Sequence, residues 1–258
     1  MQLSGRVAVI TGSRTGIGKG LAIAFLQEGA QVVIHGRDPA GHQLARELDP
    51  DGNCVYVAAD VRTRAEVDRL VDETVATFGR VDIAVNNAGG SDDFAMIHEM
   101  TDEAWNNAIA WNLNAAFWLT RRVLPDMMSR KWGRIINMSS IEGKQATSAN
   151  IAHYITNKHG LNGFTKATAF EYGSYGVTCN AICPGAIETE RMLVSGPAFA
   201  EAAGITYEDF KQHYADASAI KRLNTVEEVA AVAVLLASQN GGGVNGALIN
   251  VDGFTAQY

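Results

Sequence analysis

The chain has 258 residues, of which 47% are hydrophobic and 19% are charged. This length and apolar content suit one large α/β domain. The formal net charge of −7 argues against nucleic acid as the main partner. The three cysteines form no C-x-x-C pair and there is no H-E-x-x-H pattern, so we expect neither a disulfide framework nor a metal. The start lacks a signal-peptide layout and the longest apolar run is too short for a bilayer, so we expect a cytoplasmic protein without membrane contact.

A short apolar run at residues 6–11 leads into T-G-S-R-T-G-I-G and then into a helix that ends near Gly29. Strand, glycine-rich turn and helix form a dinucleotide-binding start, because the helix amino terminus offers unpaired N–H groups to a pyrophosphate. The spacing G-x-x-x-G-x-G departs from the usual G-x-G-x-x-G, and a tight turn without a ligand is the alternative. The cofactor-binding residues expected here are Gly12, Arg14, Thr15, Gly16, Ile17 and Gly18.

The second expected strand, at residues 31–35, decides which dinucleotide the sequence favours. A carboxylate at its end would bind the ribose hydroxyls of NAD and repel a 2′-phosphate. Gly36 stands in that place and Arg37 follows it, and an arginine can hold a phosphate with its planar fork. Arg14 adds a second cation. We therefore favour NADP(H), while NAD(H) stays possible if Arg37 points to solvent and Asp38 caps the next helix.

Two further strands are expected at residues 55–59 and 81–85, separated by an amphipathic helix over residues 64–78. The acid that follows the third strand can contact the adenine edge or cap the next helix. The fourth strand runs into N-N-A-G-G, which is either a rigid turn close to a ligand or simply a turn. The cofactor contacts expected at these two strand ends are Asp60, Val61, Asn87, Ala88 and Gly89.

Tyr154 and Lys158 stand four residues apart in a segment that is expected to be helical from near Asn150. On a helix these two positions share one face, about one turn apart. The ammonium should stabilise the phenolate, so we expect the pKa of Tyr154 to fall from about 10 toward working pH. Such a tyrosine can donate a proton to a carbonyl oxygen or accept one from an alcohol. Taken alone, the pair is also compatible with chance on a helix surface.

Five motifs occur in register along the chain: T-G-S-R-T-G-I-G, N-N-A-G, Ser140, Y-x-x-x-K and P-G. In order and approximate spacing they resemble the short-chain dehydrogenases/reductases over nearly the whole chain, in particular the 3-oxoacyl-carrier-protein reductase branch. In that family the second serine of such a pair is catalytic, which implies Ser140, with Ser139 a lesser candidate. The resemblance also implies that Tyr154 is the general acid and base, and that Lys158 tunes it and binds the nicotinamide ribose.

The segment N-L-N-A-A-F matches a family pattern at Asn112. The resemblance implies that Asn112 lies at a local break in a helix, where its backbone holds a water that leads protons to the lysine. Asn114 is the second choice. The loop after the sixth strand, at residues 177–183, is expected to line the nicotinamide. The cofactor contacts implied there are Pro184, Gly185, Ile187 and Thr189, besides Tyr154 and Lys158.

The alternation of strands and helices predicts a doubly wound parallel sheet of seven strands, a Rossmann fold in the order 3-2-1-4-5-6-7 with helices on both faces. We expect residues 1–258 to form one domain and a homotetramer, as a dimer of dimers. The stretch at about 190–223 is expected to be a substrate lid, with an insertion packed on the core as the alternative. Ser140 and Tyr154 are fourteen residues apart, one more than is common, so loop 141–150 should absorb the extra residue and reshape the substrate pocket.

These residues predict a carbonyl reductase or alcohol dehydrogenase that moves a hydride between nicotinamide and a small-molecule ketone or secondary alcohol. A 3-oxoacyl thioester reductase is an alternative within the same chemistry. A nucleotide-sugar epimerase or dehydratase shares the Y-x-x-x-K logic but commonly has a G-x-x-G-x-x-G loop. A non-catalytic NADP-binding sensor is the alternative from another class, although such proteins typically lose the tyrosine or the serine. The sequence specifies neither the substrate nor the physiological direction.

Overall fold

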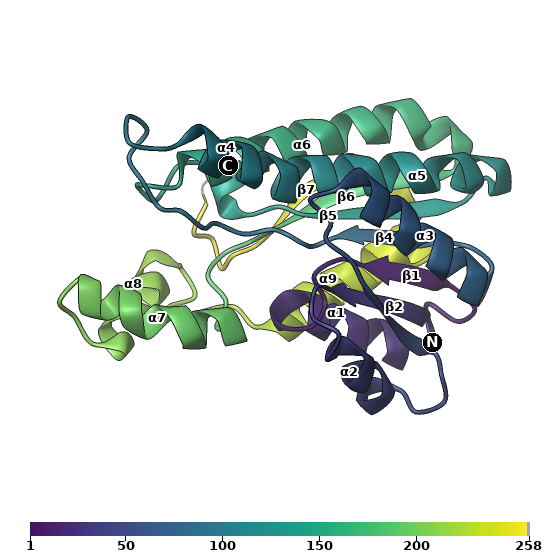
Figure 1. Ribbon diagram of the computed structural model, residues 1–258, viewed down its shortest axis with the longest axis horizontal. Helices are drawn as coiled ribbons and strands as arrows, with labels where there is room; N and C mark the ends of the chain where they lie inside the picture. The colour runs from purple at the N-terminus through teal and green to yellow at the C-terminus, as the bar shows by residue number, and fades with distance from the viewer. Residues whose placement is uncertain (257–258) are drawn as a thin grey trace.

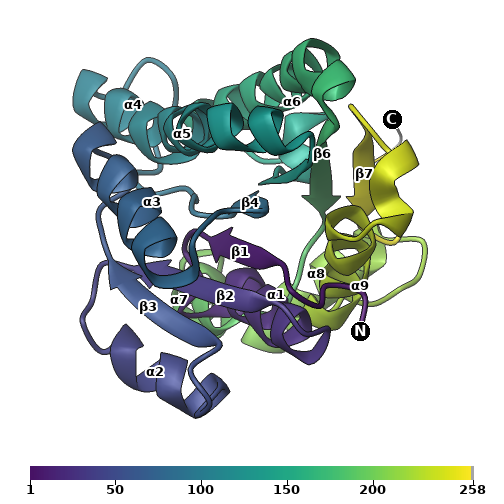
Figure 2. The same ribbon diagram turned by 90° about the vertical axis from the view of Figure 1, so that its right-hand side faces the viewer.

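The computed structural model describes residues 1–256. Seven parallel strands form one sheet in the order β3-β2-β1-β4-β5-β6-β7, and helices cover both of its faces (Figures 1 and 2). The predicted α/β class and strand order are confirmed. The strands are β1 (Val7–Ile10), β2 (Gln31–Gly36), β3 (Cys54–Ala58), β4 (Ile83–Asn86), β5 (Gly133–Met138), β6 (Val177–Pro184) and β7 (Leu248–Val251).

Two helical layers sandwich the sheet because successive side chains of a strand point to opposite faces. Ala8 and Ile10 of β1 pack in one buried cluster with α1 and α9, whereas Val9 packs in the other with α3 and α5. The unbroken apolar run of β1 is thus explained by burial on both faces. The helices are α1 (Gly16–Gln27), α2 (Gly41–Leu48), α3 (Arg64–Phe78), α4 (Asp102–Ile109), α5 (Ala115–Arg130), α6 (Ala152–Tyr172), α7 (Glu190–Ala202), α8 (Tyr207–Ala217) and α9 (Val226–Ala237).

A π-helical turn, η1 (Ala110–Asn114), joins α4 to α5. Widened turns of this kind occur as single turns inside helices and are frequent at functional sites. The expected break in the helix at Asn112 is therefore confirmed. Short 3₁₀ turns occur at η2 (Ile141–Gly143), η3 (Gly173–Tyr175) and η4 (Asn240–Gly243).

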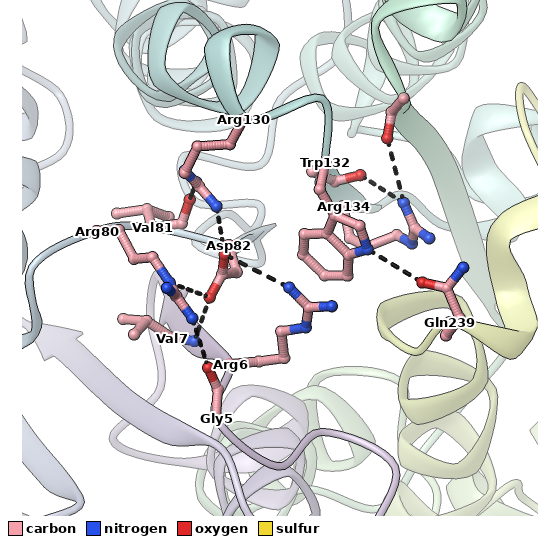
Figure 3. A network of polar contacts seen from close by, with 12 residues as sticks. Gly5, Arg6, Val7, Arg80, Val81, Asp82, Arg130, Trp132, Arg134 and Gln239 are labelled. Carbon is pink, nitrogen blue, oxygen red and sulfur yellow. Dashed lines mark hydrogen bonds and ion pairs between the residues drawn. The ribbon is translucent and has the colours of Figure 1, made fainter.

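At the amino-terminal edge of the sheet, the fully buried Asp82 joins three segments (Figure 3). Its carboxylate accepts hydrogen bonds from the backbone N–H of Val7 at 3.0 Å and from Arg80 Nε at 2.9 Å. Nη1 of Arg130, the last residue of α5, lies 2.5 Å from Asp82 Oδ1, and Nη1 of Arg6 lies 3.9 Å from the same oxygen. One buried acid thus ties the starts of β1 and β4 to the end of α5, at the edge of the sheet opposite to the strand ends considered next.

Helices α7 and α8 project from the body of the molecule and follow the carboxyl end of β6 (Figure 1). Thr189 caps α7 by accepting the Met192 N–H, and Thr206 forms a capping box with Asp209 at the start of α8. Within residues 1–256, no helix is long and apolar enough to cross a membrane.

Candidate active site

A cleft of about 710 Å³ opens at the carboxyl ends of the central strands. This volume is typical of small-molecule and cofactor sites, which in such sheets lie where the strand order reverses, here between β1 and β4. Most of the residues predicted to bind a cofactor line it. They are Gly12, Arg14, Thr15, Gly16, Ile17, Gly18, Arg37, Asp60, Val61, Asn87, Ala88, Gly89, Tyr154, Lys158, Pro184 and Thr189.

Two predicted cofactor residues lie off the lining of this cleft. The Gly185 N–H donates to the carbonyl of Val251 at 3.0 Å, so it continues the pairing of β6 with β7. Ile187 is 8% exposed and forms an isolated parallel bridge with Asn224. The loop after β6 therefore presents Pro184 to the cleft and turns Ile187 into the core.

The glycine loop requires glycine at position 12 for two separate reasons. Gly12 has a φ of +63°, a left-handed conformation that L side chains rarely adopt, and an added Cβ would lie 2.9 Å from the Cα of Ala88. The loop is also tied to the turn after β4, because Asn87 Nδ2 donates to the carbonyls of Thr11 and Gly12, each at 2.9 Å. The two predicted turns thus form one rigid wall.

His35, the last buried residue of β2, holds this wall from the other side. Its Nδ1 accepts the Gly12 N–H at 2.9 Å, and its Nε2 donates to the carbonyl of Ala59 at 2.9 Å. Only the neutral tautomer with a proton on Nε2 can do both. Burial lowers the pKa of His35 to about 4, which keeps the ring neutral. Sequence reasoning missed His35, and the available signal was one polar residue inside an otherwise apolar strand.

Helix α1 begins in the cleft without a side-chain cap and without an acid in its own first turn. The N–H groups of its first turn, which have no partner within the helix, and the positive end of the helix dipole make an anion site, which fits the pyrophosphate of a dinucleotide. Within residues 1–256, no group of three or more His, Cys, Asp or Glu side chains is arranged to hold a metal ion.

The end of β2 carries both an arginine and an acid. Arg37 is exposed and lines the cleft, as does Asp38. Asp38 pairs with Arg14 at 2.6 Å, and the Ala40 N–H together with Arg14 holds the pKa of that carboxyl below its usual range. The aliphatic chain of Arg14 lies over Gly36, where an added Cβ would be 2.9 Å from Arg14 Cδ. The predicted second cation is thus already engaged by an acid.

Tyr154 and Lys158 lie on α6 as predicted, but the direction of the tyrosine pKa is opposite to the prediction. Lys158 is 4% exposed, its Nζ donates to the carbonyl of Met138 at 2.7 Å, and burial lowers its pKa to about 8. Burial raises the pKa of Tyr154, and the Ser140 hydroxyl offsets only part of that rise. The Lys158 ammonium lies 5.3 Å from the centre of the Tyr154 ring and is held by a carbonyl, so desolvation of the phenol dominates.

The two serines after β5 have different partners. The Ser140 hydroxyl lowers the pKa of Tyr154 in part and accepts the Glu142 N–H at 3.1 Å. Ser139 lines the cleft, but its hydroxyl turns back to the carbonyl of Lys158 at 3.5 Å. Of the two serines, Ser140 is therefore the one that acts on the pKa of Tyr154, despite the fourteen-residue spacing. The intervening loop is closed by the Glu142 carboxylate, which accepts the Thr147 N–H at 3.0 Å.

Asn112 is 2% exposed, at the centre of the π-helical turn. Its amide exchanges two hydrogen bonds with Gly90, each of 2.9 Å, and also donates to the carbonyl of Ala108 at 3.0 Å. An added Cβ on Gly89 would lie 2.6 Å from Asn112 Oδ1 and 3.4 Å from Lys158 Nζ. The asparagine therefore anchors the turn after β4 beside the lysine.

Sequence reasoning missed a charged bridge at the mouth of the cleft. Arg191, in the first turn of α7, donates from Nη2 to the carbonyl of Ser91 at 2.7 Å and pairs with Asp92 at 2.7 Å. Its guanidinium lies 5.7 Å from the ring of Trp111. All but Ser91 line the cleft. Neither Asp92 nor Arg191 belongs to a motif, so only the fold reveals that they meet.

Comparison with known proteins agrees with this geometry. A family model described as enoyl-(acyl carrier protein) reductase matches residues 12–254. A D-beta-hydroxybutyrate dehydrogenase of Cupriavidus necator is 39% identical, covering 97% of this chain and 98% of the relative. A 3beta-hydroxysteroid dehydrogenase 2 of Eggerthella lenta is 37% identical, covering 99% and 96%. A solved variant of the actinorhodin polyketide ketoreductase with NADPH has a TM-score of 0.92 at 32% identity, covering 100% and 99%. The chain belongs to the short-chain dehydrogenase/reductase family.

Proposed function

We propose that the protein is an NAD(P)(H)-dependent oxidoreductase that moves a hydride between the nicotinamide and a secondary alcohol or ketone. The observation that carries the proposal is the position of Tyr154 and Lys158, which line the cleft that begins at a dinucleotide-type glycine loop, with Ser140 close enough to lower the pKa of Tyr154. The names of the similar dehydrogenases, one for a hydroxy acid and one for a hydroxysteroid, support chemistry at a CH–OH group.

In this mechanism the chain handles the proton while the nicotinamide, when bound, supplies or accepts the hydride. The Ser140 hydroxyl would donate to the substrate oxygen and orient it. The Tyr154 hydroxyl would give its proton to that oxygen in reduction and take it back in oxidation. The pKa of Lys158 is lowered to about 8, so its ammonium is charged at pH values below that. This charge would stabilise the phenolate of Tyr154 as it forms.

The proposed route for that proton runs past Lys158 to Asn112. The Asn112 side chain is already engaged by Gly90 and Ala108. We therefore assign the water to the Asn112 backbone, as the family resemblance implies, in a turn whose hydrogen bonding is rearranged by the π-helix. The side-chain contacts support a positioning role for the Asn112 amide.

We propose NADP(H) as the preferred cofactor, because Arg37 is exposed at the end of β2 and lines the cleft. NAD(H) is the alternative, and the carboxylate of Asp38 at the same end supports it. We also propose that α7 and α8 act as the substrate lid, since Arg191 of α7 reaches across the cleft to Ser91. A homotetramer stays a proposal, to be tested by light scattering.

A 3-oxoacyl thioester reductase is the second candidate within this reaction class. It is supported by the similarity to a monensin polyketide synthase putative ketoacyl reductase of Streptomyces virginiae, 36% identical, and to the actinorhodin ketoreductase. A non-catalytic sensor finds less support, because Ser140, Tyr154 and Lys158 are all present and adjacent.

The test is turnover of Tyr154→Phe with a substrate panel of D-3-hydroxybutyrate, a 3β-hydroxysteroid and a 3-oxoacyl thioester. We expect kcat to fall by about 10³-fold, since the general acid is lost, while the Kd for NADPH stays within about twofold. Tyr175→Phe, a matched change at an exposed tyrosine, should leave both values unaltered. Substantial turnover by Tyr154→Phe would overturn the proposal, and wild-type protein that binds NADPH but turns over none of a broad ketone panel would favour the sensor.

A further inference from the structure

The first turn of α7 reaches both walls of the cleft through two adjacent residues of opposite charge. Arg191 is bound to Ser91 and Asp92 on the β4 side. On the other side, Glu190 Oε2 accepts a hydrogen bond from the backbone N–H of Gly16 at 2.7 Å. Helix α7 is therefore tied by one anchor to the glycine loop and by the other to the turn after β4.

The contact between Glu190 and Gly16 lies at the amino terminus of α1. Gly16 is the first residue of α1, and that helix has neither a side-chain cap nor an acid in its own first turn. Its free N–H groups attract an anion. Among the contacts of the described residues, the anion at this N–H is the carboxylate of Glu190, which lies 174 positions further along the chain. Glu190 is thus an anion held at the start of α1.

That start is also where the proposed function puts the pyrophosphate of the cofactor. One N–H donor cannot serve two anions at full strength, and a carboxylate beside a diphosphate repels it. The approach is close, because an added Cβ on Gly16 would lie 3.5 Å from Thr189 Cβ and 3.9 Å from Glu190 Oε2. Glu190 is exposed, so water can receive its carboxylate when it is displaced.

Resting on the proposed cofactor site, we infer that Glu190 is an internal competitor of the cofactor pyrophosphate and a determinant of cofactor affinity. Binding of a dinucleotide exchanges the Glu190 carboxylate for a phosphate oxygen at the Gly16 N–H. The exchange releases one of the two anchors of α7 and leaves Arg191 as the other. Glu190 therefore lowers the affinity for the dinucleotide, and its displacement by the dinucleotide frees one of the two contacts that hold the start of α7.

The experiment compares Kd values of wild type, Glu190→Ala and Glu190→Gln for NADPH and NADH by fluorescence, and for ADP and adenosine by calorimetry. The matched control is Glu188→Gln, which removes the same charge from an exposed carboxylate that pairs with Lys211 at 3.2 Å. We expect Glu190→Ala to bind the dinucleotides and ADP about fivefold more tightly, the size of one exposed charge-assisted contact. Adenosine has no phosphate, so its affinity should not change.

A gain of affinity distinguishes competition from a structural role, because a variant that merely disturbs α7 would bind more weakly. Unchanged affinity for NADPH and ADP in Glu190→Ala overturns the inference while the cofactor site stands. An equal gain in Glu188→Gln, or an equal gain for adenosine, also overturns it, because net charge or local loosening would then explain the effect. If wild type and all variants bind no dinucleotide, this result overturns the proposed cofactor site and, with it, this inference.

Discussion

His35 Nδ1 accepts a hydrogen bond from the backbone N–H of Gly12 at 2.9 Å, so a side chain of β2 holds the glycine loop that follows β1. The other ring nitrogen is occupied by the carbonyl of Ala59. A protonated imidazole would present a second N–H to the Gly12 N–H and break the contact. The shape of the proposed phosphate-binding wall therefore depends on a neutral histidine.

The first prediction concerns acid stability. Burial lowers the pKa of His35 from 6.5 to about 4. As the pH falls, His35 takes up its proton in the unfolded chain before it does so in the folded protein. The contribution of neutral His35 to the free energy of unfolding is therefore complete above pH 6.5 and is lost as the pH drops from 6.5 toward 4. The full loss is about 3 kcal/mol, since each pKa unit corresponds to about 1.4 kcal/mol. Urea denaturation at pH 7.0, 6.0 and 5.0 measures the part of this loss that occurs above pH 5, about 2 kcal/mol.

The control is His35→Asn, which does not titrate in this range. Its free energy of unfolding should be lower at pH 7 but nearly flat between pH 6.5 and 5. Glu228, whose pKa is lowered to about 2 chiefly by Arg222, loses its contribution only below the ordinary glutamate range, so it does not confuse this window. A slope in His35→Asn equal to that of wild type would show that another group is responsible.

The second prediction concerns the cofactor. Arg37→Ala should weaken NADPH binding by about tenfold, the size of one charge-assisted contact to a 2′-phosphate, while the Kd for NADH stays within about twofold. Arg46→Ala removes the same charge from an exposed position of α2, outside the cleft, and should change neither value. Fluorescence titration gives the four constants. Equal weakening of NADPH and NADH by Arg37→Ala would contradict the preference, and a loss of NADH binding in Asp38→Asn would favour NAD(H).

The fold was predictable because its signals are local. The amphipathic helix predicted over residues 64–78, for example, has the bounds of α3 (Arg64–Phe78). The contacts that cross the cleft were not predictable. Arg191 pairs with Asp92 because the loop after β6 returns to the edge of the sheet where β4 ends. The local sequence of either segment does not reveal that the two segments lie close together. The same holds for the contact of Glu190 with Gly16.

The pKa of Tyr154 shows a second limit of sequence reasoning. Spacing places Lys158 one turn away, which suggests a lowered pKa, but spacing does not reveal how deeply the phenol is buried. The structure shows that burial wins, with Ser140 as the first compensating group. The π-helical turn at Asn112 likewise came from family resemblance, since nothing in its local composition demands an inserted residue.

The third prediction separates the two serines. Ser140→Ala removes the hydroxyl that lowers the pKa of Tyr154 and that would donate to the substrate oxygen once substrate is bound, so kcat should fall by about 10²-fold or more. Ser139→Ala removes only a long hydrogen bond to the carbonyl of Lys158 and should change kcat by less than about threefold. The pH–rate profiles of both variants provide a second readout, in which Ser140→Ala shifts the basic limb upward. The reverse order of effects would assign the role to Ser139.

The fourth prediction concerns stability away from the cleft. Asp82 is fully buried and balances Arg6, Arg80 and Arg130 (Figure 3). Asp82→Asn leaves three guanidinium groups around a neutral amide, so the free energy of unfolding should fall by about 3 kcal/mol. The partial exposure of the arginines limits the loss, because water reaches them.

The matched change is Asp72→Asn, which breaks an exposed pair with Arg122 and should cost less than about 1 kcal/mol. Denaturant unfolding measures both variants, and turnover of the folded fraction should equal wild type in each because neither residue borders the cleft. Equal losses of stability would mean that the buried acid contributes no more than a surface ion pair. A fall in kcat with unchanged stability would place Asp82 in the reaction rather than in the scaffold.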